Sequence, residues 1–258
     1  MSYKSFDINV DKVIGIVGGM GPEAGVDLVS SIYKNTQAFL DQDHLSVILM
    51  SFPKYLEDRT AFIMKKKSIN PALNIVKIIL KLERAGATLI GIACNSSYSP
   101  SIHEVILAEL KKKNSKVKLL NMPYETCQYI KKEHPDLSRI GVISTNGTYH
   151  SGVYHNILRN LNFEVIIPDY NFQHNIINQV IYNSDYGIKA NSSSVISKKV
   201  EEQLQKILNY FEYKKVDAVI LGCTELALIP ENYYHTDILL FNSNELFAKA
   251  LIKEIEKN

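Results

Sequence analysis

Two stretches of the chain end a mostly apolar run in a cysteine: ATLIGIACN at residues 87–95 and VDAVILGCT at residues 216–224. Each follows, at nearly equal spacing, another apolar run that enters a glycine-bearing turn: VIGIVGGMG at residues 13–21 and IGVISTNGT at residues 140–148. Short runs rich in β-branched residues predict strands that helices cover on both faces. The sequence therefore predicts two related halves, each with a buried strand that ends in a cysteine.

Strand-like runs alternate with longer amphipathic stretches along the whole chain, a pattern typical of parallel α/β folds. The predicted strands are Lys12–Val17, Ser46–Ser51, Thr88–Ala93, Lys116–Leu120, Arg139–Ser144, Glu164–Ile167, Asp217–Leu221 and Ile238–Phe241. The predicted helices include Pro71 to Gly86, Pro123–Lys132, about Ser194 to Tyr213 and about Asn244 to Lys257. We expect two domains related by a pseudo-twofold axis, with the active site in the cleft between them. Residues 1–121 plus 236–258 would form the first, which carries Cys94, and residues 122–235 the second, which carries Cys223.

The composition excludes several classes of partner. Of 258 residues, 46% are hydrophobic and 22% are charged, and the formal net charge is +2, which gives no electrostatic basis for binding nucleic acid or an anionic membrane. No apolar run approaches the roughly 18 residues of a membrane span. The first twelve residues are charged and lack an apolar signal region. Three cysteines cannot all pair within the chain, so we expect free thiols and a cytoplasmic protein.

Cys94 and Cys223 occupy the carboxyl ends of their strands, where ligands collect in parallel α/β sheets. Polar residues able to cap a helix follow each cysteine, and a helix N-terminus favours the thiolate, so both pKa values are expected to fall toward neutrality. Two thiols facing each other across a cleft supply the base and the acid that inversion of a stereocentre requires. The alternative is that a cysteine fills apolar space, and this interpretation is preferred for Cys127 in the middle of a predicted helix.

Other chemistry finds no support in the sequence. The turn Gly18–Glu23 follows a strand, but its spacing does not fit G-x-G-x-x-G, and we expect it to line a small anionic substrate instead of a dinucleotide. Walker, H-E-x-x-H, Cys-x-x-Cys and Gly-x-Ser-x-Gly motifs are absent from the sequence. We therefore expect neither a metal nor a cofactor.

At these residues the chain resembles the aspartate/glutamate racemase family, which works without pyridoxal phosphate. The similar segments are GGMGPEA at 18–24, EDRT at 57–60, ACNSSY at 93–98 and LGCTEL at 221–226. The resemblance implies two Rossmann-like parallel-sheet domains, a homodimer, and Cys94 and Cys223 as paired acid/base thiols. It implies reversible racemisation of an acidic amino acid, with aspartate as the first candidate substrate and glutamate as the next.

The resemblance also implies a substrate-binding set. Asn95, Ser96 and Thr224, with Thr145 and Thr148, would contact the α-carboxylate or the ammonium group, and Arg59 and Lys189 would hold the side-chain carboxylate. The full predicted set is Met20, Ser51, Arg59, Asn95, Ser96, Thr145, Thr148, Lys189, Thr224 and Glu225. For Arg59 the alternative is a surface ion pair with Glu57 or Asp58, and for Lys189 a flexible loop position.

Four residues depart from the family pattern: Ser96 replaces threonine but keeps the hydroxyl, and Tyr98 is expected to alter the lining of the cleft. Tyr98 and Phe247 stand where histidine is frequent, and Asn242 replaces a common aspartate, which leaves both thiols intact but affects the expected substrate. The alternatives are therefore a related isomerase of the maleate isomerase or hydantoin racemase type, or a catalytically weak protein that binds amino acids.

Overall fold

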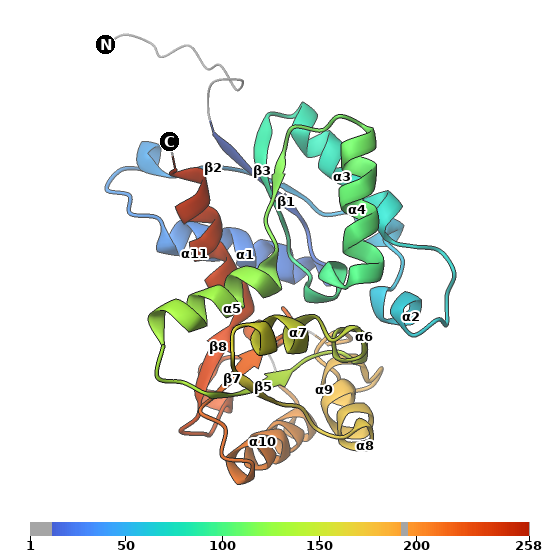
Figure 1. The fold of residues 1–258 in the computed structure, drawn as a ribbon, viewed down its shortest axis with the longest axis vertical. Helices are drawn as coiled ribbons and strands as arrows, with labels where there is room; N and C mark the ends of the chain where they lie inside the picture. The colour runs from blue at the N-terminus through green and yellow to red at the C-terminus, as the bar shows by residue number, and fades with distance from the viewer. Residues whose placement is uncertain (1–11, 192–195, 258) are drawn as a thin grey trace.

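Two parallel β-sheets of four strands each form the centre of the molecule (Figure 1). The computed structural model describes residues 12–191 and 196–257. The strands are β1 (Val13–Val17), β2 (Ser46–Met50), β3 (Ala87–Ile92), β4 (Lys118–Leu119), β5 (Arg139–Ile143), β6 (Glu164–Ile166), β7 (Ala218–Leu221) and β8 (Leu239–Asn242). Each predicted strand is confirmed, with small differences at its ends.

The two sheets share one topology. The strand order is β2-β1-β3-β4 in the first sheet and β6-β5-β7-β8 in the second, and every pairing is parallel. Strands β3 and β7 thus occupy equivalent inner positions, and Cys94 and Cys223 follow their carboxyl ends. The predicted α/β fold with two similar parallel sheets is confirmed.

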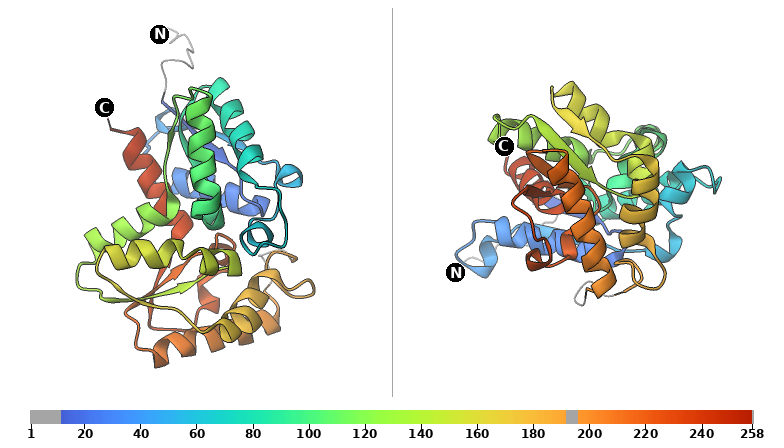
Figure 2. Two further views of the ribbon diagram at one scale, coloured as in Figure 1. Left: turned by 45° about the vertical axis from the view of Figure 1, so that its right-hand side comes forward. Right: turned by 90° about the horizontal axis from the view of Figure 1, so that it is seen from below.

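Helices cover both faces of the first sheet (Figures 1 and 2). A Cβ at Gly15 would meet Leu82 of one helix layer, whereas a Cβ at Gly91 would meet Phe247 and Leu251 of the other. The helices are α1 (Pro22–Asn35), α2 (Arg59–Ile63), α3 (Ala72–Arg84), α4 (Pro100–Lys112), α5 (Met122–Glu133), α6 (Asn146–Ser151), α7 (Val153–Asn160), α8 (Tyr170–Phe172), α9 (Asn178–Tyr182), α10 (Lys198–Tyr213) and α11 (Ser243–Ile255). Short 3-10 helices are η1 (Asp41–Asp43), η2 (Pro53–Tyr55), η3 (Asn95–Tyr98), η5 (Leu226–Leu228) and η6 (Glu231–Tyr233), and η4 (Gln173–Ile177) is a π-helical turn.

Local signals in the sequence account for several helix ends. Pro71 precedes α3 at its N-cap, and Gly86 follows its last turn with a φ of 99°, a value that favours glycine. The predicted helix from about Ser194 is α10, which begins at Lys198 after the Ser197 side chain caps it; Ser194 itself lies outside the described residues. Within the described residues, no helix has the length and apolar character needed to cross a bilayer.

The chain crosses between the halves a second time immediately after β8. The expected boundary at residue 236 placed this strand in the first domain, but β8 pairs with β7 in the second sheet. Helix α11 then packs against α1 and against β1 and β3 of the first sheet (Figure 2). The chain therefore leaves the second sheet between Asn242 and Ser243. The sequence prediction grouped β8 with α11 because the two are adjacent in sequence, but hydrogen bonds to β7 place β8 in the second sheet.

Phe247 anchors α11 to the first sheet, and its loss should destabilise the fold. Its ring is fully buried against Gly91 of β3 and beside the ring of Tyr98. Phe247→Ala should lower the free energy of unfolding by about 3–5 kcal/mol because it leaves a cavity in the core. Urea denaturation followed by circular dichroism measures this loss. The matched Leu73→Ala, at a position 51% exposed on α3, should cost much less, and equal losses for the two variants would contradict the assignment.

Candidate active site

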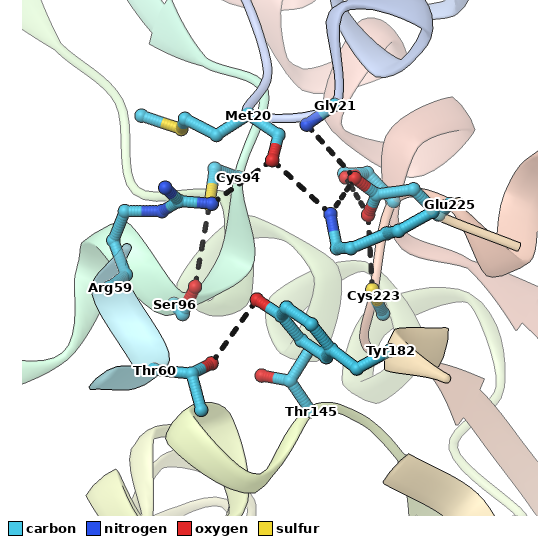
Figure 3. A network of polar contacts seen from close by, with 12 residues as sticks. Met20, Gly21, Arg59, Thr60, Cys94, Ser96, Thr145, Tyr182, Cys223 and Glu225 are labelled. Atoms are coloured by element: carbon cyan, nitrogen blue, oxygen red, sulfur yellow. Dashed lines mark hydrogen bonds and ion pairs between the residues drawn. The ribbon is translucent and has the colours of Figure 1, made fainter. Parts of the chain in front are cut away.

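A small cavity lies between the two halves, at the carboxyl ends of the strands. Its free volume is only about 10 Å³, room for roughly one water molecule, and both cysteines line it. Cys94 follows β3 of the first sheet and Cys223 follows β7 of the second, and Figure 3 shows them on opposite sides of the site. The lining residues are Arg59, Cys94, Asn95, Ser96, Thr145, Thr148, Tyr182, Lys189, Gly222, Cys223, Thr224 and Glu225.

The surroundings of Cys94 favour its thiolate. Burial alone would raise the pKa of this thiol, but the positive charge of Arg59 and hydrogen bonds from Ser96 and Ser97 outweigh burial, so that its pKa is lowered. The Ser96 hydroxyl lies 3.4 Å from Cys94 Sγ. The lowered pKa agrees with the expectation from sequence, although its main favourable cause is a cation instead of a helix N-terminus, since only the short η3 follows Cys94.

The surroundings of Cys223 favour the neutral thiol, which corrects the expectation that both pKa values would fall. Burial and the negative charge of Glu225 raise the pKa of Cys223 well above its ordinary value, and the more distant Lys189 only partly offsets them. Cys223 Sγ donates a hydrogen bond of 3.1 Å to Glu225 Oε2. The sequence interpretation placed Glu225 in the substrate-binding set and among residues able to cap a helix, and it missed the effect of this carboxylate on the neighbouring thiol.

The Glu225 carboxylate joins the two halves (Figure 3). Its Oε1 accepts hydrogen bonds from Lys189 Nζ and from Gly21 N, the latter at 3.2 Å. The Lys189 ammonium also donates to the Met20 carbonyl at 3.3 Å. Gly21 permits this approach, because a Cβ there would lie 2.5 Å from Glu225 Oε1. Lys189 thus lies in the site as expected, but its charge is already paired with an internal carboxylate.

Arg59 is buried at 4% exposure and is not the surface ion pair considered as an alternative. Its Nη1 donates to the Glu57 carbonyl at 2.9 Å and its Nη2 to the Met20 carbonyl at 3.1 Å. The Asp58 side chain instead caps α2, by accepting a hydrogen bond from Ala61 N. Arg59 Nε has no partner among the described residues. A buried guanidinium with unused donors at a cavity is a site for an anion.

The structure brings most of the other predicted residues into the same cavity. Asn95, Ser96, Thr145, Thr148 and Thr224 all line it. Met20 contributes through its carbonyl oxygen, which accepts from Arg59 and Lys189.

One predicted residue is misplaced and two were missed. Ser51 follows β2, is exposed, and does not line the cavity; its side chain instead lies against Gly18. Tyr182 and Gly222 line the cavity without having been predicted. The Tyr182 hydroxyl lies 3.4 Å from Thr60 Oγ1, and burial raises its pKa to about 12, so that it stays neutral. No motif in the sequence marked Tyr182, whereas Gly222 adjoins the second cysteine and could have been found.

Of the residues that depart from the family pattern, Ser96 lines the cavity, whereas the other three lie outside it. Tyr98 does not reach the cavity, contrary to the expectation, since its hydroxyl accepts from Ile92 N at 3.0 Å and lies 3.3 Å from Ile92 O. Asn242 caps α11 through its side-chain oxygen, and Phe247 belongs to the core. Cys127 is also fully buried in α5, where burial raises its pKa, as its apolar interpretation predicted. All three cysteines are free.

Residues 17–251 match the family described as Asp/Glu/Hydantoin racemase. The chain belongs to this family. Aspartate racemase from Picrophilus torridus has 31% sequence identity and a TM-score of 0.73, with 96% of this chain and 95% of that chain covered. The resemblance seen in the sequence and the predicted enzyme class, an amino-acid racemase, are therefore confirmed.

Two more distant racemase-family structures show the same fold. An aspartate racemase homologue from Pyrococcus horikoshii OT3 has 21% identity and a TM-score of 0.68, with 95% of this chain and all of that chain covered. Glutamate racemase from Francisella tularensis, solved with D-glutamate, has 21% identity and a TM-score of 0.63, with 96% and 82% covered.

The two racemase thiols should differ in their reaction with iodoacetamide. Because the pKa of Cys94 is lowered and that of Cys223 is raised, Cys94 should be alkylated first, and its labelling should persist as the pH falls below the ordinary thiol range. Peptide mass spectrometry over a pH series measures both rates.

Arg59→Gln is the matched variant for this measurement. Removal of the cation should raise the pKa of Cys94 and move its labelling profile to higher pH. Cys127 serves as the internal reference and should stay unlabelled in the native protein. Faster labelling of Cys223, or an unchanged profile in Arg59→Gln, would show that the assigned charges are wrong.

Proposed function

We propose that this chain catalyses cofactor-independent racemisation of an acidic amino acid, with aspartate as the preferred substrate and glutamate as the next candidate. The observation that carries the proposal is the pair of thiols on opposite sides of one small polar cavity. Inversion at Cα needs a base on one face of the carbon and an acid on the other. Cys94 and Cys223 come from equivalent strands of two similar halves and can supply both.

The protonation states of the two thiols before a substrate binds give them different roles in the first proton transfer. Cys94 as thiolate removes the Cα proton of one enantiomer, and Cys223 as thiol delivers its proton to the opposite face. The Cys223 thiolate that results lies beside Glu225 and is disfavoured there, so it regains a proton readily. For the other enantiomer the two cysteines exchange roles, because catalysis must follow the same path in both directions.

Substrate recognition follows from the donors around the cavity. Hydroxyl and amide groups of Asn95, Thr145, Thr148 and Thr224 can hold the α-carboxylate and stabilise the enediolate that develops from it. Arg59 retains a free Nε and is the cation best able to hold a side-chain carboxylate. Lys189 contributes less to this second contact, because Glu225 neutralises it. One available guanidinium favours a substrate with a single side-chain carboxylate, and the similarity to an aspartate racemase favours aspartate.

The proposal predicts exchange at Cα in deuterated water. Purified protein with L-aspartate, without added cofactor, should yield D-aspartate and incorporate deuterium at Cα, with aspartate faster than glutamate and both much faster than alanine. Proton NMR measures the exchange and chiral chromatography the product. If no acidic amino acid loses its Cα proton, the racemase proposal is wrong, and cis–trans isomerisation of maleate or racemisation of a hydantoin becomes the reaction to test.

Replacing either thiol should stop racemisation while the fold remains. Cys94→Ser and Cys223→Ser should each lower kcat by about 10²- to 10⁴-fold, the usual contribution of a positioned acid or base. Each variant should still exchange the Cα hydrogen of the one enantiomer that faces its remaining thiol. Cys127→Ala is the control and should retain activity, because Cys127 lies outside the cavity. Equal activity of Cys94→Ser and the native protein would refute the two-thiol mechanism.

A homodimer and a cytoplasmic location also belong to this proposal. The dimer follows from the resemblance to racemases, and the location follows from three free thiols in one chain. Neither enters the proton-transfer argument.

A further inference from the structure

A chain of buried hydrogen bonds connects the loops that carry the two cysteines. The Tyr154 hydroxyl donates to Asn95 Oδ1 at 2.6 Å. Asn95 Nδ2 donates to Ser243 Oγ at 3.2 Å, and Ser243 Oγ donates to the Leu221 carbonyl at 2.8 Å. Asn95 directly follows Cys94, and Leu221 is separated from Cys223 only by Gly222. Tyr154, Asn95 and Ser243 are all buried, at 2%, 3% and 0% exposure.

The direction of every bond in this chain is fixed. The Leu221 carbonyl can only accept, so Ser243 Oγ donates its one hydrogen there and must accept from the Asn95 amide nitrogen. The amide oxygen of Asn95 therefore faces Tyr154, and because this oxygen can only accept, the phenol is the donor. Burial raises the pKa of Tyr154 well above its ordinary value, which keeps the phenol protonated. The Asn95 side chain is therefore held in one of its two amide orientations.

This orientation leaves one donor of Asn95 for the cavity. An amide nitrogen carries two hydrogens, and among the described residues only the bond to Ser243 uses one of them. Asn95 lines the cavity, so the second hydrogen is available to a substrate oxygen. If the amide were turned over, its oxygen would instead meet the negative charge of a carboxylate.

The chain also brings together elements from both halves. Tyr154 lies on α7 of the second half, Asn95 begins η3 of the first, and Ser243 begins α11 where the chain crosses between them. The Tyr154 ring packs beside Gly222, where a Cβ would lie 3.1 Å from Tyr154 Cε2. A single side chain thus contacts the residue after one cysteine and the residue before the other.

We propose that Tyr154 and Ser243 are positioning residues, which act through Asn95 to orient its free amide hydrogen toward substrate and to hold the two cysteine loops at a fixed spacing. This inference rests on the proposed racemase function and names two residues outside the cavity lining on which that function depends. Misplacement of a reacting group by about 1 Å can cost about 10²-fold in rate, so a loosened network should be visible in kcat.

A double-mutant cycle tests this proposal. Tyr154→Phe and Ser243→Ala should each lower kcat for aspartate racemisation by about 10- to 100-fold. Asn95→Ala should have a similar or larger effect. When Tyr154→Phe is added to Asn95→Ala, the further loss should be less than about threefold, because the residue through which Tyr154 acts is already gone. A purely structural role would make the two losses multiply.

Tyr149→Phe is the matched control. It removes a phenol hydroxyl from the same half, one that donates only to the Pro168 carbonyl at 3.0 Å, and it should change kcat little. Native kcat in Tyr154→Phe, or losses that multiply in the double variant, would overturn the proposal. A kcat in Tyr149→Phe as low as in Tyr154→Phe would do the same.

A second measurement keeps this proposal separate from the proposed function. If the native protein turns over no acidic amino acid, the proposed function has failed, and the network is then tested by iodoacetamide alone. Tyr154→Phe and Ser243→Ala should raise the alkylation rate of Cys223 several-fold relative to Tyr149→Phe, because its loop loses an anchor. Unchanged alkylation in both variants would overturn the positioning role without reference to any substrate.

Discussion

The buried carboxylate of Glu225 is the constraint on which the site depends. Removing a charge from water is costly unless other groups compensate it, and Glu225 is compensated by Lys189, Gly21 N, the Cys223 thiol and the Thr224 hydroxyl. Three of these donors come from the second half and one from the first. The requirement to satisfy one charge therefore fixes the contact between the halves, the place of Lys189 and the protonation of Cys223.

The two halves share a topology, but the charged groups beside their two cysteines differ. Cys94 and Cys223 follow equivalent strands, yet a guanidinium lies beside one and a carboxylate beside the other. An acid/base pair needs this difference, because two thiols with the same pKa would both be protonated or both be ionised for much of the time. In the proposed mechanism, the repeated fold would supply opposite faces for proton transfer, and the unlike neighbours would supply opposite protonation states.

Local sequence predicted the parts of the molecule that local chemistry determines. The apolar runs located all the strands, and the two cysteine motifs identified the site. What failed depends on contacts distant in sequence: β8 belongs to the sheet of β7, and Ser51 lies outside the cavity. The pairing of Lys189 with Glu225 was not foreseen for the same reason, although Lys189 lines the cavity as predicted. Tyr182 was missed for the same reason, since only the fold brings its hydroxyl near Thr60 and into the site. The raised pKa of Cys223 was missed because Glu225 also fits a helix-capping pattern.

The same contacts that build the site also close it. Cys94 and Cys223 are only 8% and 4% exposed, so a substrate cannot reach both sulfur atoms while the halves remain in this contact. The bonds that cross the cleft at Met20 and Gly21 are few and are made by Lys189 and Glu225. A bound substrate carboxylate near Lys189 would compete with Glu225 for this cation. The halves also share one apolar cluster, which includes Ile92 of β3 and Ile220 of β7, so the contact between them is apolar as well as electrostatic.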